Sequence, residues 1–378
     1  MRKGRKNISA RTKSIKEKND CFYRNLEMLN ILFYVGKGFM LRKQLFILIR
    51  NFYKINEHTA NDMLSDLLQH GLVIKKQATD TQTCLYILTK FPLTQYKEGC
   101  CNTRDATSIK LNNRKIWNNI YRTEFIIREI IPMMEKTNIA LELQNLFDFL
   151  HKYNITIYTS ENQISVYQLY KSLYEKFPIK DIEAIKNQRP IESAFMNDYY
   201  KADAEFYNYQ CNFLGYSPDE EFTYLLELKE KLEREKDLLS SPKELKKYYY
   251  NLFNMTAAGF FFIGLPNEDG SIIIGTFDKC NNMYLKKIYE NAICIALMLE
   301  RYLGYFPHVT LQVYMSDADN LASLRSREEE NGYDYVKQEM SNISKRDVFF
   351  KNYKIPEQYW DFIQVDYIHY PLREKYNL

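Results

Sequence analysis

The chain has 378 residues, of which 46% are hydrophobic and 26% charged, so a packed core is expected and global disorder is not. This length favours two or three domains over one. No stretch reaches ~18 uninterrupted apolar residues, so we expect no transmembrane helix. The seven cysteines are scattered and form no C-x-x-C pair, which indicates reduced thiols, a cytoplasmic location and no zinc site.

Residues 1–20 form a basic arm. They carry eight Lys or Arg against two carboxylates, although the net charge of the whole chain is only +4. The arm lacks the apolar core and cleavage site of a signal peptide. It is either a solvated tail or a mobile segment that adds phosphate contacts to a neighbouring DNA-binding domain. On the second interpretation, the arm residues at the DNA are Arg2, Lys3, Arg5 and Lys6.

Residues 21–95 are the most informative part of the chain. Apolar residues at helical spacing predict a first helix over 22–35, which ends at Gly36, and a second helix over 41–52. A third helix is predicted to begin after Asn56, because its short side chain can accept a bond from a free backbone N–H. This helix should end at Gly71, where a left-handed C-cap costs glycine little.

Two short strands follow the third helix, over 72–76 and 84–89, and a polar turn at 79–81 joins them. Three helices followed by a hairpin is the element order of a winged helix. The sequence TANDMLSDLLQHGLV followed by CLYILT also resembles that family. In the family the third helix enters the major groove and the hairpin, or wing, lies along the backbone or minor groove.

The resemblance implies two groups of DNA-contacting residues. Asn, His and Ser side chains can read base edges, and Lys can neutralise phosphate. Asp62 and Asp66 count against DNA, because carboxylates repel phosphates, and winged helices also serve as protein-docking modules. The predicted contacts are Glu57, His58, Asn61 and Ser65 on the third helix, and Lys75, Lys76, Gln77, Thr79, Thr81 and Gln82 in the wing.

A mainly helical region is predicted over 106–240, after a connector at 92–105. Its first helix, over 111–135, carries a basic face that either extends a DNA footprint or is solvated, formed by Arg114, Lys115, Arg122 and Arg128. An internal boundary is expected at 240–243, where Ser-Ser-Pro breaks the pattern. The other predicted elements of this region are helices over 141–150, 167–174 and 218–236 and an extended stretch at 155–158.

Residues 243–378 are predicted to form an α/β domain. Strand-length apolar runs alternate with helical segments in the order β-β-α-β-α-β, which is typical of a mixed sheet with helices on at least one face. The strands are expected at 259–264, 271–277, 308–315 and 362–370, and the helices at 283–302 and 318–340. The fold class is therefore α+β, with an N-terminal winged helix, a helical middle region and a C-terminal mixed α/β domain.

Carboxylates near the strand ends raise the question of a Mg²⁺ site, because Mg²⁺ prefers oxygen ligands. Asp278, Asp317 and Asp366 occupy such positions. However, Lys279 directly follows Asp278, so the two side chains should point to opposite faces of a strand. Asp317 and Asp319 precede an apolar helix and are expected to cap it. The five histidines are isolated, so we assign no catalytic residue, metal site or cofactor.

The layout resembles plasmid or transposon proteins of the replication-relaxation kind, which place a winged helix before a longer, divergent domain. This resemblance implies a DNA-binding accessory factor of a mobile element, acting in transcription, replication or transfer. Its expected partner is double-stranded DNA, with the C-terminal domain serving a homodimer or a protein partner and no membrane involved. Two alternatives remain open: a metal-dependent nuclease or nicking enzyme targeted by the winged helix, and a protein-interaction subunit.

Overall fold

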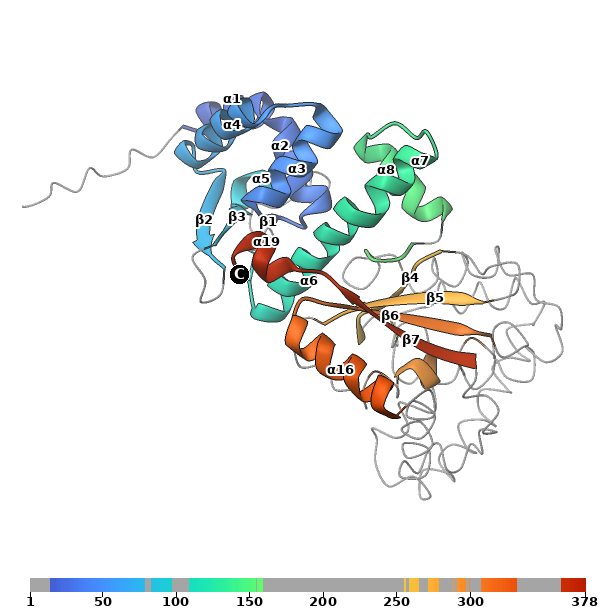
Figure 1. The fold of residues 1–378 in the computed structure, drawn as a ribbon. Coiled ribbons are helices and arrows are strands. Elements are labelled where there is room, and N and C mark those ends of the chain that lie inside the picture. Colours follow the sequence, from blue (N-terminus) through green and yellow to red (C-terminus); the bar gives the residue numbers. More distant parts are fainter. Residues whose placement is uncertain are drawn as a thin grey trace, which may run out of the picture. The chain divides into compact units, whose positions relative to one another are not determined.

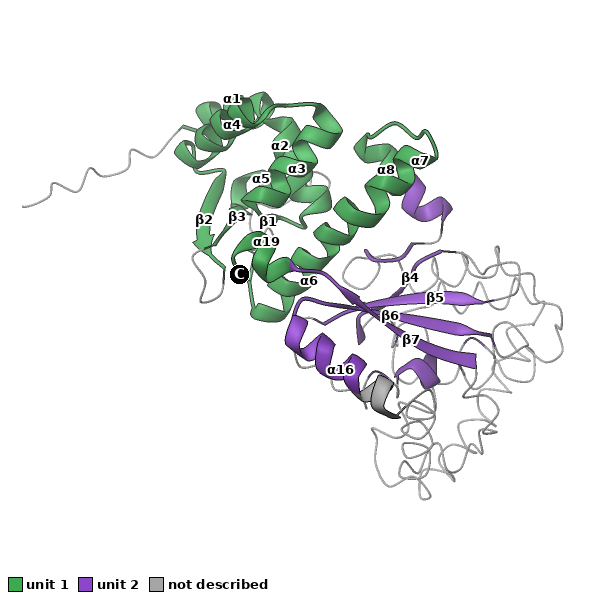
Figure 2. Cartoon of the chain, in the orientation of Figure 1, with its two compact units in different colours: residues 1–147, 372–378 green, residues 148–371 purple. Residues whose placement is uncertain are grey.

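The computed structural model divides the chain into two compact units (Figure 2). The first comprises residues 1–147 and 372–378, and the second residues 148–371, so the chain leaves the first unit once and returns to it. The structure describes residues 14–78, 83–96, 109–153, 155–158, 258–264, 271–278, 291–296, 307–331 and 362–378, together with residues 255, 288 and 299 (Figure 1).

The first unit begins with three consecutive helical segments. Ser14 opens them with a capping box, in which its hydroxyl accepts from the Glu17 N–H at 3.2 Å and its own N–H donates to the Glu17 carboxylate at 2.7 Å. The helix thus starts earlier than apolar spacing predicted, because polar capping and not burial sets its beginning. Its end before Gly36 is confirmed. The segments are α1 (Ile15–Arg24), α2 (Leu26–Asn30) and the π-helical turn η1 (Ile31–Val35).

Two further helices follow a short strand. The turn between them places Lys54 in the left-handed region, at φ 57°. Asn56 caps the second of these helices as predicted, since its side chain accepts from the Thr59 N–H at 2.9 Å. Gly71 follows this helix with φ 70°, the conformation that favours glycine. The elements are β1 (Phe39–Leu41), α3 (Arg42–Tyr53) and α4 (Glu57–Gln69).

A three-stranded antiparallel sheet closes this region. The predicted hairpin is present, and its strands are β2 (Val73–Gln77) and β3 (Cys84–Leu88). The strand order is β1-β3-β2, so β3 is central and β2 lies at an edge. The sequence did not predict β1, because three buried residues are too few to show alternation.

The stretch expected as a connector from Pro92 is instead helical at its start. Helix α5 (Lys90–Tyr96) includes Pro92 in its first turn, where a missing N–H costs no helical hydrogen bond. The Tyr96 ring stacks on Phe33, with centroids 4.2 Å apart and planes 8° apart, and its hydroxyl donates to Asn30 Oδ1 at 2.8 Å. These contacts anchor α5 to the first helical segments.

Helix α6 is joined to the three-helix region by buried polar contacts. Asn119 Nδ2 donates to the carbonyls of Gly36 at 2.9 Å and Phe39 at 2.6 Å, and Gln44 donates to the Ile120 carbonyl at 2.9 Å. The prediction of a basic outer face fails at Arg122, which is 1% exposed. The elements are α6 (Asn113–Phe125), η2 (Ile126–Ile130), α7 (Ile131–Lys136) and α8 (Leu143–Lys152).

Residues 372–378, the return segment, complete the first unit. Within it, α19 (Leu372–Tyr376) buries Leu372 and Tyr376. Lys375 Nζ lies 2.6 Å from Glu124 Oε1, and the Tyr376 hydroxyl donates to the other oxygen of the same buried carboxylate. The Thr83 hydroxyl, at the start of β3, donates to the Tyr376 and Asn377 carbonyls at 2.7 and 2.9 Å. The return segment is thereby bonded to both α6 and the hairpin.

The second unit contains a four-stranded mixed sheet in the predicted order. Strands β5, β6 and β7 are parallel, and β4 is antiparallel to β5. Gly275 lies under the Phe261 ring, where an added Cβ would come within 2.5 Å of ring atoms. The strands are β4 (Phe260–Phe262), β5 (Ile272–Phe277), β6 (Val309–Met315) and β7 (Ile363–His369), and α16 (Ala318–Asn331) joins β6 to β7.

Three other predictions concern the extended stretch at 155–158, the elements over 167–243 and the absence of a transmembrane helix. The extended stretch at 155–158 forms a single bridge, Ile155 with Ile263, and no longer strand. The predicted helices over 167–174 and 218–236 and the break at 240–243 lie outside the described residues. Across the helices that the structure describes, none is both long and apolar enough to cross a membrane.

The buried carboxylate gives the first prediction. Replacing Lys375 by Met should lower the free energy of unfolding of the first unit by about 2 kcal/mol, because the Glu124 charge loses its ion pair with Lys375 while staying buried. Urea unfolding followed by Trp117 fluorescence in a Trp360→Phe background measures this. Glu124→Gln in the Lys375→Met background should recover part of the loss, and Lys136→Met is the control. A loss no larger than in the control would contradict the role of the pair.

Candidate nucleic-acid interface

The outer face of α4 is the first part of the candidate interface. Ala60, Leu64 and Leu67 are buried at helical spacing and fix the inner face of the helix. The opposite face is solvent-exposed and carries His58, Asp62, Ser65 and Gln69. The structure therefore places His58 and Ser65 facing outward, as the resemblance implied.

Polar contacts limit what this face can read. His58 Nδ1 lies 3.2 Å from Asp62 Oδ2, although both side chains are largely exposed. The Asn61 side-chain oxygen accepts from the Arg42 guanidinium, and its amide donates to the Glu57 carbonyl at 2.9 Å. Asn61, predicted to read a base, is therefore held by α3 and by its own helix, and would have to break these bonds to contact a base edge.

Asp66 faces inward and not toward a phosphate backbone. Its Oδ2 accepts from Arg24 at 2.7 Å and Asn25 at 2.7 Å, and the Cys21 thiol lies 3.4 Å away. Burial raises the pKa of the Asp66 carboxyl, but the hydrogen bonds from Arg24, Asn25 and Cys21 lower it more, so the pKa lies below the ordinary 3.8. The argument that Asp66 would repel DNA is weakened by these contacts, because its charge is paired with Arg24 within the protein.

Cys21, Asp66 and His70 are candidate metal ligands. One ligand atom of each lies within 4.8 Å of the others. The Arg24 guanidinium already occupies the carboxylate, however, with an ion pair at 2.7 Å. Burial and the neighbouring Asp66 charge raise the pKa of the Cys21 thiol to about 11, which disfavours the thiolate that a metal needs. The group fits a polar tie between α1 and α4 better than it fits a metal.

The edge strand β2 is the second part of the candidate interface. Ile74, Lys75, Lys76 and Gln77 are all exposed on it, and β2 packs against α4. Neither the Lys75 nor the Lys76 side chain has a hydrogen-bond or ion-pair partner among the residues that the structure describes. Two ammonium groups without such a partner, on a strand that packs against α4, can contact a polyanion without first breaking contacts of this kind.

Helix α3 adds a basic face that the sequence analysis missed. Arg42, Lys43 and Arg50 are exposed on it, and Arg42 lies with its guanidinium 4.9 Å from the centre of the Phe46 ring. The spacing of residues 42, 43, 46 and 50 places them on one side of a helix. A helical projection of residues 42–53 shows this basic face in the sequence. The apolar spacing used to predict the helix does not reveal it.

Several predicted contacts lie beyond the residues that the structure describes. They include four of the eight cations of the basic arm and the tip of the hairpin. The structure therefore places the two ends of the predicted wing but not its tip. The predicted residues concerned are Arg2, Lys3, Arg5, Lys6, Thr79, Thr81 and Gln82.

The carboxylates of the second unit do not form a metal group in the part of the chain that is described. Asp317 Oδ1 accepts from the Asn320 N–H at 2.9 Å, which is the predicted cap of α16. Asp366 pairs in register with Gln312, whereas Asp278 follows the β5 residue that pairs with Tyr314, so alternation places Asp366 and Asp278 on opposite faces of the sheet. This arrangement gives the nuclease alternative no support.

No protein-family model matches the chain, and comparisons with curated proteins and with solved structures found no match. The geometry of the first unit is therefore the basis for assigning a function.

The inward position of Asp66 gives the second prediction. Its folded-state pKa is depressed, so its ionised form stabilises the protein above pH 3.8, and this contribution is lost as the pH falls through the lower folded-state pKa. Asp66→Asn should therefore cost about 1 kcal/mol of unfolding free energy at pH 7. The difference from wild type should shrink below pH 3.8.

Urea unfolding at a series of pH values measures this difference. The matched control is Asp62→Asn, since Asp62 is exposed and its ion pair is with the exposed His58 of the same helix. A cost for Asp66→Asn that stays constant down to pH 2.5 would mean that the carboxylate charge is not what stabilises the tie.

Proposed function

We propose that this chain binds double-stranded DNA and that its first unit is a winged helix. The order helix, β1, α3, α4, β2, β3 supports this assignment, as does a sheet in which β1 pairs with β3 and not with β2. In this arrangement α4 is the recognition helix and the β2–β3 hairpin is the wing.

The observation that carries the proposal is the pair of exposed lysines on β2, whose side chains have no partner among the described residues. Lys75 and Lys76 are exposed on an edge strand, next to the helix that would enter the groove. Cations that neutralise DNA phosphates release counterions and so provide affinity that depends on salt. The basic arm, with Arg2, Lys3, Arg5 and Lys6, would add contacts of the same kind.

Sequence preference is proposed to come from α4 and to be limited. His58 and Ser65 present polar groups outward, but Glu57 and Asp62 add two carboxylates to the same helix. No Arg lies on α4 to form the paired hydrogen bonds that distinguish guanine. The binding mode is therefore one in which the wing and arm hold the backbone while α4 contributes a few base contacts.

The second unit is proposed to provide dimerisation or partner binding. The assignment to a mobile element, in transcription, replication or transfer, rests on the resemblance in layout. The unit adds a mixed sheet with a parallel core, a fold that serves many functions and fixes none.

A protein-docking role is the second candidate for the first unit, and the surface of α4 favours it. Glu57 and Asp62 would lie close to phosphates in a DNA complex, and the exposed Ile74 and Leu68 offer apolar contacts for a protein partner. Charge substitutions on α4 and β2 discriminate between the two roles.

The wing lysines give the third prediction. Lys75→Ala with Lys76→Ala should weaken binding to a 20-base-pair duplex by roughly ten- to a hundredfold near 0.1 M salt, and should lower the slope of log K against log salt by about 2. Fluorescence anisotropy over a salt series measures both quantities. Lys136→Ala removes an exposed cation at the end of α7 and is the control. An unchanged slope in the double variant would exclude β2 from the DNA interface.

The exposed carboxylate of Asp62 on α4 gives the fourth prediction. If α4 lies in the groove, Asp62→Asn should strengthen DNA binding severalfold at low salt, because it removes a repulsive charge near phosphates. The effect should fade as salt rises. The same anisotropy series measures it, with Asp148→Asn, on α8, as a control outside the candidate interface. Weaker binding, or no change at any salt, would place α4 away from the DNA.

A further inference from the structure

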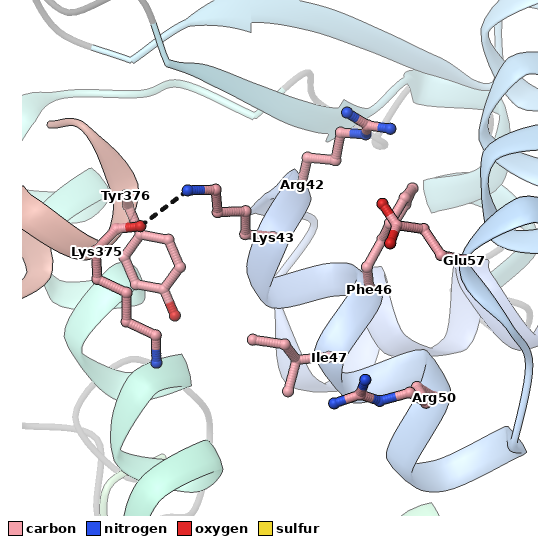
Figure 3. A pocket seen from close by; sticks show the side chains of 8 residues that line it. All are labelled: Arg42, Lys43, Phe46, Ile47, Arg50, Glu57, Lys375 and Tyr376. Carbon is pink, nitrogen blue, oxygen red and sulfur yellow. Dashed lines mark hydrogen bonds between the residues drawn. The ribbon is translucent and has the colours of Figure 1, made fainter.

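A cavity of about 330 Å³ lies between α3 and the return segment, entirely within the first unit (Figure 3). The α3 side is formed by Arg42, Lys43, Phe46, Ile47 and Arg50, and the facing side by Lys375 and Tyr376. Glu57, at the start of α4, completes the lining. Residues more than 300 positions apart thus form one cavity.

The charges of this lining are not balanced by the residues that the structure describes. Lys375 is neutralised by Glu124. Lys43, in contrast, donates to the Lys375 carbonyl at 3.0 Å, and this acceptor carries no charge. The Arg50 guanidinium has no hydrogen-bond or ion-pair partner among the described residues.

Arg42 adds a third cation whose acceptor is neutral, since it donates to the Asn61 side-chain oxygen. Three cationic groups therefore face a single lining carboxylate outside the Lys375–Glu124 pair, that of Glu57. Like charges that line one cavity repel each other, and a bound anion lowers this repulsion. The excess of positive charge matches a dianion.

The chemistry of the lining narrows the class of anion. Arginine forks match the oxygens of phosphate, and lysine contributes a point charge. Phe46 and Ile47 are half-buried and give the cavity an apolar portion that a bare ion would leave unused. The volume is at the lower end of the range for small-molecule sites.

We propose that this cavity binds a small organic phosphate monoester, with the phosphate between Lys43 and Arg50 and the apolar group against Ile47 and Phe46. The site is independent of the proposed DNA contacts on β2. Its ligand would bridge α3 and the return segment, and would contact Glu57 at the start of the proposed recognition helix. The ligand is thus positioned to stabilise the return segment in its docked state.

The test is isothermal titration of the full chain with phenyl phosphate and with inorganic phosphate, at pH 8 and constant ionic strength and without DNA. The account expects saturable binding of one phenyl phosphate per chain, at least fivefold tighter than inorganic phosphate. Arg50→Ala should weaken it at least tenfold, and Lys136→Ala should not change it. Absence of saturation, or equal binding by Arg50→Ala, would overturn the proposal.

A second measurement distinguishes a loss of ligand binding from a loss of folding in the Arg50→Ala variant. The unfolding temperatures of wild type and of Lys136→Ala should rise as phenyl phosphate is added, because a ligand that binds the folded state stabilises that state by mass action. Arg50→Ala, melting normally without ligand, should shift much less. A shift of equal size in both variants would mean that the phosphate acts elsewhere.

The phosphate could also be that of a DNA backbone, and competition separates the two sources. Phenyl phosphate bound in the cavity should remain bound when a duplex is added at equal concentration. Displacement by the duplex would contradict a small-molecule site and would assign the α3 face to DNA. Failure to bind DNA at all would leave this test unaffected, since the titration contains none.

Discussion

A carboxylate that is completely buried makes the first unit depend on residues from a distant part of the sequence. Glu124 is 0% exposed, and its oxygens are bonded by Lys375 and by the Tyr376 hydroxyl. Burial, and then the charge and hydrogen bond of Glu124, raise the pKa of Tyr376, so its hydroxyl stays protonated as a donor. An unpaired charge in this position would cost several kcal/mol. Docking of the return segment is therefore part of the fold of the first unit.

This dependence links the candidate interface to the rest of the chain. The return segment follows β7 of the second unit directly, and Thr83, at the base of the proposed wing, donates hydrogen bonds to its backbone. The same segment forms one side of the basic cavity on α3. Changes that release it would alter the surroundings of the wing and of α3 together. The proposed DNA contacts on β2 and the proposed phosphate site on α3 thus rely on one structural contact.

Local sequence signals predicted the elements whose causes are local. The Asn56 cap, the spacing of Ala60, Leu64 and Leu67, and the apolar runs of the second unit all act within a few residues. The failures concern contacts between distant residues. The inward turn of Asp66 depends on Arg24 and Asn25, more than 40 positions earlier, and no periodicity encodes it. The docking of residues 372–378 on Glu124 spans about 250 positions, so the sequence could not reveal which unit those residues complete.

Hydrogen–deuterium exchange of the full chain, with and without a saturating duplex, tests the central claim most directly. If the first unit is a winged helix on DNA, the backbone amides of α4 and of the β2–β3 hairpin should exchange more slowly in the complex. The exchange of the amides of β5, β6 and β7 should not be slowed by direct contact with the duplex, and these amides serve as the internal reference. Protection confined to the strands of the second unit, or no protection anywhere at low salt, would contradict DNA binding by α4 and the wing.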